Sequence, residues 1–350
     1  MGDAGAVLQA VGQIAAASRA VTRIRRSVAI REKQFQIASS GAQEAVDRPP
    51  TPPEASAPRP SAARGLLRAL RPKQWVKNVL VAAAPGAAGV LTESDSIPKV
   101  ALAFVAFCMV SSATYLFNDV GDIEEDRRHP TKRERPIAAG IVSPRTAIVT
   151  GVILGLGGFG VALAVRPAFL AVVAGYVVVT VAYTLWLKHM AVFDIAVVAS
   201  GFIFRAVGGG VAVDVPISRW FLIVTSFGSL FIVAGKRYSE HVTMGVEREA
   251  TRATLAAYSR DYLRFVYTMA AAVTLTGYCL WAFEQSQNEG AIPWFELSIG
   301  PVVLGILRYA LLLEEGYGGA PEDIALGDRP IQVLGLLWVI LFGAGVTVAH

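Results

Sequence analysis

The chain has 350 residues, of which 54% are hydrophobic and only 17% are charged, which argues against a water-soluble domain and favours a multi-pass membrane protein. The formal net charge is +5, but residues 1–72 contain 11 Lys and Arg against 5 Asp and Glu, whereas residues 73–350 contain 21 against 22. Because the positive excess lies entirely in the amino-terminal segment, we exclude a nucleic-acid-binding core and expect a basic segment at an anionic membrane surface.

The amino-terminal region divides into two segments. Residues 1–40 mix Ala, Val and Ile with five arginines, which predicts an amphipathic helix on the membrane surface. Residues 41–63 are rich in Pro and Ala and are expected to form a linker. A dispensable extension is the alternative interpretation for both segments. The predicted membrane domain therefore covers residues 64–350.

Apolar runs separated by short polar segments predict an all-α bundle of about nine transmembrane helices. Their lengths suit the ~17–25 residues that cross a bilayer, and they lack the alternation of membrane β-strands. The predicted helices are 75–92, 98–118, 145–165, 168–187, 191–212, 217–235, 262–283, 293–313 and 331–349.

Lys and Arg are concentrated in alternate loops. With a cytoplasmic amino terminus, the inner loops are 119–144, 188–190, 236–261 and 314–330. Most loop cations fall in these segments, whereas the outer side has Lys99, Arg166 and Arg219. The positive-inside rule therefore predicts a membrane protein whose polar clusters face the cytoplasm.

An acidic run follows the second predicted helix. On a helix, Asp119, Asp122 and Asp126 share one face, and Asn118 lies one turn before Asp122. Carboxylates placed together repel each other unless a cation lies among them, and oxygen ligands suit Mg²⁺, which often bridges to substrate phosphates. We therefore predict a catalytic metal–diphosphate site here, with a solvated acidic loop as the alternative.

Cations follow this acidic run directly. Arg127, Lys132 and Arg135 are candidates for binding a polyanionic substrate, because Arg and Lys bind phosphate oxygens. The alternative is that these residues only keep the loop on the cytoplasmic side. His129 is interpreted as a polar loop residue rather than a general base.

Two further polar clusters lie at the ends of predicted helices. Tyr183 and Lys188, followed by Asp194, are candidates for phosphate binding, with anchoring at the bilayer edge as the alternative. Arg205 lies deep in the fifth helix, about 16 Å along the axis from Asp194, so we expect it to pair elsewhere.

The last cluster ends the sixth predicted helix. Lys236 and Arg237 are followed by Glu240, one helical turn after Lys236. Two cations with one carboxylate suit a phosphate-rich ligand with a single extra metal contact. The alternative is an ordinary cytoplasmic helix end that carries positive charge.

The motif N-D-x-x-D-x-x-x-D at 118–126, followed by R-P at 135–136, resembles the UbiA-type intramembrane prenyltransferase superfamily. The resemblance covers about residues 65–350. It implies nine membrane helices around a cytoplasm-facing cavity in which Mg²⁺ holds a diphosphate.

The segments R-P-K-Q-W-V-K-N at 71–78 and G-K-R-Y-S-E at 235–240 are similar to the decaprenyl-phosphate phosphoribosyltransferase branch of that superfamily. Members of this branch transfer 5-phosphoribose from phosphoribosyl pyrophosphate to decaprenyl phosphate, and the product feeds cell-wall arabinan synthesis. The resemblance adds Lys73 and Asn78 to the expected substrate-binding residues. Assembly into a homo-oligomer is left open.

Two departures separate the chain from typical prenyltransferases. Lys236, Arg237 and Glu240 stand where a second D-x-x-x-D motif is usual, and the Tyr-x-x-x-Lys motif is one residue longer, from Tyr183 to Lys188. Cations in place of carboxylates suit the 5-phosphate of phosphoribosyl pyrophosphate. The alternatives are a Mg²⁺-dependent prenyltransferase with a prenyl diphosphate donor and a lipid transporter.

Overall fold

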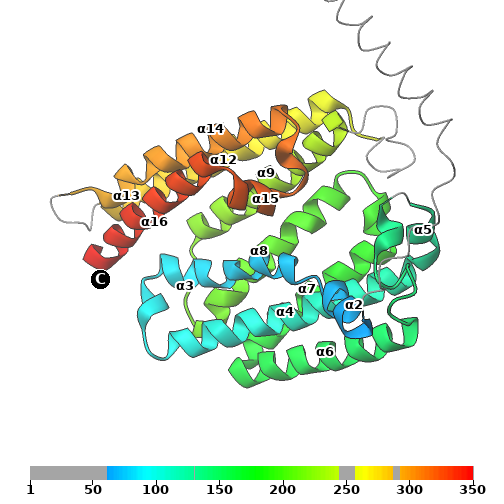
Figure 1. Ribbon diagram of the computed structural model, residues 1–350. Coiled ribbons are helices and arrows are strands. Elements are labelled where there is room, and N and C mark those ends of the chain that lie inside the picture. The colour runs from blue at the N-terminus through cyan, green and yellow to red at the C-terminus, as the bar shows by residue number, and fades with distance from the viewer. Residues whose placement is uncertain (1–60, 130, 244–256, 287–291, 350) are drawn as a thin grey trace, which may run out of the picture. The chain divides into compact units, whose positions relative to one another are not determined.

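The computed structural model describes residues 61–129, 131–243, 257–286 and 292–349 (Figure 1). Every regular element in these ranges is a helix, which confirms the predicted all-α class. The amphipathic segment predicted at 1–40 lies outside the described residues, as does the predicted linker except for residues 61–63.

Eight segments of the described chain are long and apolar enough to cross a bilayer. They are α4 (Ser96–Gly121), α6 (Pro144–Val165), α7 (Pro167–Leu185), α8 (Phe193–Val213), α9 (Arg219–Thr243), α12 (Arg260–Ser286), α13 (Trp294–Leu297) continued by α14 (Ile299–Glu314), and α16 (Arg329–Ala349). Shorter elements between them are α2 (Ala62–Ala69), α5 (Ile123–Arg128), η3 (Lys132–Glu134), η4 (Leu187–His189), η6 (Tyr317–Gly319) and α15 (Pro321–Gly327).

The segment predicted as the first membrane helix, 75–92, differs from the other eight. It is wound as the 3₁₀ helix η1 (Pro72–Ala82), the short helix α3 (Ala83–Ala87) and the turn η2 (Val90–Thr92). Gly89 has a φ of 74°, which ends the helical path. The prediction of one continuous α-helix here is therefore wrong, and the described residues hold eight candidate spans rather than nine.

The transmembrane segments form two groups (Figure 1). Helices α4, α6, α7 and α8 pack together, as do α9, α12, α14 and α16, and the α8–α9 contact joins the groups. Phe107 and Phe169 are buried in the first core, while Phe231 and Tyr267 are buried in the second. Outward-facing apolar side chains such as Leu156 are exposed, as expected for a surface in contact with lipid.

Helix α8 approaches η1 very closely at a glycine. A Cβ built on Gly209 would lie 1.7 Å from the carbonyl oxygen of Val81. Glycines let the backbones of membrane helices approach closely, and Gly209 allows this contact between α8 and η1. It fixes η1, which carries several polar side chains, against the middle of the bundle.

We expect Gly209→Ala to prevent this packing, because the added methyl group meets backbone rather than a flexible side chain. Overpacking costs about 1–3 kcal/mol and occasionally more, and a clash with backbone lies at the upper end of that range. Thermal unfolding in detergent should show a large fall in Tm. Gly160→Ala in α6 is the matched control, since nothing lies within 4 Å of its Cβ position. Equal Tm values for the two variants would contradict the close approach.

Candidate active site

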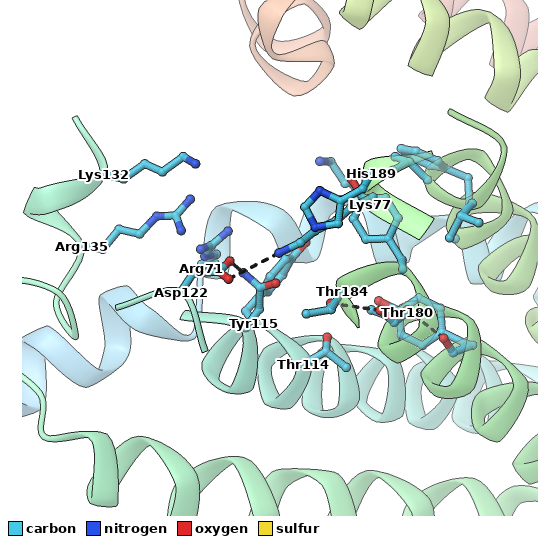
Figure 2. Close-up of a pocket in the computed structure, with 18 of the residues that line it drawn as sticks. Arg71, Lys77, Thr114, Tyr115, Asp122, Lys132, Arg135, Thr180, Thr184 and His189 are labelled. Carbon is cyan, nitrogen blue, oxygen red and sulfur yellow. Dashed lines mark hydrogen bonds and ion pairs between the residues drawn. The ribbon is translucent and has the colours of Figure 1, made fainter. Parts of the chain in front are cut away.

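A cavity of about 470 Å³ lies where α4 ends, between η1, α4, α7, η4 and α8 (Figure 2). Cationic side chains from several of these elements converge on it. They are Arg71, Lys77, Lys132, Arg135, Lys188 and Arg205. In Figure 2, Lys132 and Arg135 lie on one side of Asp122, whereas Lys77 and His189 lie on the other.

Two carboxylates of the predicted metal motif bind arginines. Asp119 is only 2% exposed and accepts hydrogen bonds from Arg71 Nη2 at 2.5 Å and Arg135 Nη1 at 3.1 Å. Asp126 is 1% exposed and accepts from the same Arg135 Nη1 at 2.7 Å. Buried charges need partners of opposite sign, so these pairs fix both guanidinium groups at the cavity wall.

Asp122 and Asn118 are the members of the motif that line the cavity. Helix α4 ends at Gly121, and Asp122 caps it before α5 begins. The side-chain amide of Asn118 donates to Asp122 Oδ2 at 2.9 Å, and Lys188 Nζ lies 3.4 Å from Asp122 Oδ1. Glu125, which the sequence did not single out, lines the cavity as well.

The three-carboxylate face expected from the sequence is therefore not a preformed metal cage. Within the described ranges, no three His, Cys, Asp or Glu side chains are grouped so that they hold a metal by themselves. Helix α4 ends at Gly121, so Asp119 and Asp126 lie on different helices rather than on one helical face. Both carboxylates bind arginines instead. Mg²⁺ usually takes one or two carboxylates together with substrate phosphates, so Asn118 and Asp122 still fit such an ion.

Some of the other predicted binding residues line the cavity and some do not. Lys132, Arg135, Tyr183 and Lys188 line the cavity. Arg127 is not in its lining; its side chain is 52% exposed and pairs with Glu124 at 2.8 Å. Lys73 is also exposed and outside the lining.

Arg205 lines the cavity from α8. Its Nε donates to Asn78 Oδ1 at 2.6 Å, and its Nη2 donates to the Tyr176 hydroxyl at 3.2 Å. Asn78 is buried and outside the lining, so it orients Arg205. Arg205 and Asp194 make separate contacts, as their spacing along the helix predicted.

Lys77 was missed by the sequence analysis, although it belongs to the segment 71–78. Its Nζ donates to Gln74 Oε1 at 2.5 Å and lies 3.5 Å from Glu322 Oε2 on α15. The partner is almost 250 residues away in the chain, so no local pattern identifies the pair.

The predicted cluster at 236–240 forms an internal ion-pair network. Arg237 is 4% exposed, donates through Nη1 to Glu240 Oε2 at 3.0 Å, and places Nε 3.3 Å from Asp194 Oδ2. Lys236 Nζ lies 3.9 Å from Glu240 Oε1. None of these four residues is in the lining of the cavity.

Residues 79–323 match the UbiA prenyltransferase family. The chain belongs to this family. It is 47% identical to decaprenyl-phosphate phosphoribosyltransferase of Mycobacterium tuberculosis (strain CDC 1551 / Oshkosh), over 81% of this chain and 94% of the relative. It is 46% identical to the protein of that name from Corynebacterium glutamicum, over 81% and 86%.

Solved structures show the same fold. A UbiA homolog from Archaeoglobus fulgidus bound to DMAPP and Mg²⁺ has a TM-score of 0.63 at 16% identity, over 81% of this chain and 99% of that chain. A structure of digeranylgeranylglyceryl phosphate synthase has a TM-score of 0.57 at 19% identity, over 82% and 98%. This UbiA family member is therefore an integral membrane protein.

We expect Arg135→Gln to destabilise the protein, because it removes the group that bridges two buried carboxylates. Breaking a buried ion pair costs about 3 kcal/mol. Arg127→Gln is the control, since its exposed pair with Glu124 contributes about 0.5 kcal/mol. Thermal unfolding of both variants tests this difference, and an unchanged Tm for Arg135→Gln would refute the bridging role.

Proposed function

We propose that this protein transfers 5-phosphoribose from phosphoribosyl pyrophosphate to decaprenyl phosphate and releases pyrophosphate. The cationic cavity around Asp122 is the observation that carries the proposal. Its support from relatives is strong, because proteins named for this activity are 47% and 46% identical over most of their length. The described residues form both the cavity and the candidate membrane spans that an enzyme acting on a lipid substrate needs.

The chemistry of the donor matches the placement of the cations. Phosphoribosyl pyrophosphate carries a pyrophosphate at ribose C1 and a separate phosphate at C5, and the acceptor lipid brings a further phosphate. Cations on both sides of Asp122 suit a substrate with anionic groups at two ends (Figure 2). Val197, Val198 and Phe202 add an apolar wall that suits the polyprenyl chain.

In the proposed reaction, an oxygen of decaprenyl phosphate attacks ribose C1, and the bond between C1 and the pyrophosphate oxygen breaks. The attacking phosphate is already anionic, so the reaction needs no general base. Arg135, Lys132 and Lys188 would bind the departing pyrophosphate. Because Asp119 and Asp126 hold Arg135 in place, its charge is oriented before the substrate binds.

Asn118 and Asp122 would hold Mg²⁺ together with the donor's pyrophosphate. Bound there, the ion supplies charge neutralisation for the leaving group. The solved homolog with DMAPP and Mg²⁺ supports a divalent ion in this fold, while the residues that would hold it here are our proposal.

We further propose that residues 64–350 form the catalytic domain in the plasma membrane and that the cavity opens to the cytoplasm, where a water-soluble donor is available. The concentration of Lys and Arg in the loops at this end supports that orientation. The product would then serve as an arabinan precursor for the cell wall.

The defining experiment incubates the purified full chain with Mg²⁺, decaprenyl phosphate and phosphoribosyl pyrophosphate labelled in the ribose. We expect label in the lipid phase and release of pyrophosphate. A parallel reaction replaces the donor by labelled prenyl diphosphate. Transfer from the prenyl donor alone would favour the prenyltransferase alternative.

Asp122→Asn should lower kcat/KM for the donor by about 100-fold, because it removes the carboxylate that faces the cavity beside Asn118. EDTA should abolish transfer by the wild type, and added Mg²⁺ should restore it. Glu124→Gln is the control, since this exposed carboxylate pairs with Arg127 instead. Full activity of Asp122→Asn at limiting Mg²⁺ would falsify the metal role.

A further inference from the structure

The short segment 186–192 carries Lys188 and His189 into the cavity wall, and it ends in a strained residue. Val192 has φ 71° and ψ −48°, a region that β-branched residues rarely adopt. Such a conformation persists only when surrounding contacts hold it. The contact in question is a hydrogen bond of 2.5 Å from the Val192 backbone N–H to the hydroxyl of Tyr258.

The Tyr258 hydroxyl uses both of its hydrogen-bonding functions. It accepts from Val192 and donates to Asp194 Oδ1. The other carboxylate oxygen of Asp194 lies 3.3 Å from Nε of Arg237, which in turn binds Glu240. Tyr258 is buried, and burial together with the bond to Asp194 raises the pKa of its hydroxyl, so it remains a donor.

These contacts connect the cavity wall to elements that do not line the cavity. Tyr258 lies just before α12, and Arg237 lies near the end of α9. Both act on the start of α8 through Asp194, and Tyr258 also holds the residue at which segment 186–192 meets that helix. Lys188 is four residues before Val192 and places Nζ 3.4 Å from Asp122.

We propose that Tyr258 is a positioning residue: its hydroxyl holds Val192 in the strained conformation that keeps Lys188 beside Asp122. Asp194 and Arg237 fix the hydroxyl in turn, which gives these two residues a role other than direct phosphate binding. The inference rests on the proposed function, because it requires Lys188 to contact the anionic donor.

Tyr258→Phe tests this role, since it removes the hydroxyl and keeps the ring. We expect the KM for phosphoribosyl pyrophosphate to rise about fivefold, with a smaller change in kcat. Tyr262→Phe is the matched control, because Tyr262 stacks on Tyr258 with ring centroids 5.7 Å apart and an interplanar angle of 7°. The KM of this control should stay within about twofold of the wild type.

A double-mutant cycle separates positioning from a general loss of structure. If Tyr258 acts through Lys188, adding Tyr258→Phe to Lys188→Gln should change the KM by less than about twofold. A fivefold rise in both backgrounds would overturn the proposal, as would an unchanged KM in the single variant. If Tyr258→Phe does not fold, Asp194→Asn replaces it in the same cycle and is judged by the same criteria.

The wild type is assayed first, which distinguishes the two ways of failing. No phosphoribosyl transfer by the wild type refutes the proposed function itself. Normal transfer by the wild type without coupling between Tyr258 and Lys188 refutes only the positioning role. Thermal unfolding of each variant, measured in the same detergent, identifies those that are folded well enough to be included.

Discussion

The geometry of the cavity depends on one shared guanidinium nitrogen. Arg135 Nη1 lies 2.7 Å from Asp126 and 3.1 Å from Asp119, and Asp119 also binds Arg71. Two buried carboxylates without counter-charges would be costly, so the arginines and the acids hold each other in place. The arrangement ties together η1, the end of α4, α5 and the loop after η3, and orients positive charge toward the cavity.

The membrane domain surrounds this end of the bundle with apolar helices, and the 3₁₀ segment η1 is fitted against α8 at Gly209. This contact places Arg71 and Lys77 at the cavity and Asn78 next to Arg205. Close packing in the middle of the bundle and ion pairing at its end therefore act on the same short segment. A displacement of η1 would alter both.

Much of the fold was predictable because hydropathy depends on residue type alone. Eight predicted membrane helices correspond to eight spans, whereas hydropathy reveals neither the 3₁₀ winding of η1 nor its close contact with α8. In the acidic motif, the expectation of one continuous helical face does not hold, because α4 ends at Gly121 and Asp126 lies on α5. The spacing of the acidic residues also does not indicate that Arg71 and Arg135, which lie outside the motif, bind Asp119 and Asp126. Arg237 shows the same limit, since its partner Asp194 lies on another helix.

The paired charges also bear on how the enzyme would empty its site after each cycle. Arg71, Arg135, Lys77 and Lys188 each have a carboxylate neighbour supplied by the protein. At these four positions, a departing polyanion would compete with carboxylates that the protein supplies. Such a wall would bind a multiply charged group while it is being transferred, and the carboxylates would favour its release afterwards.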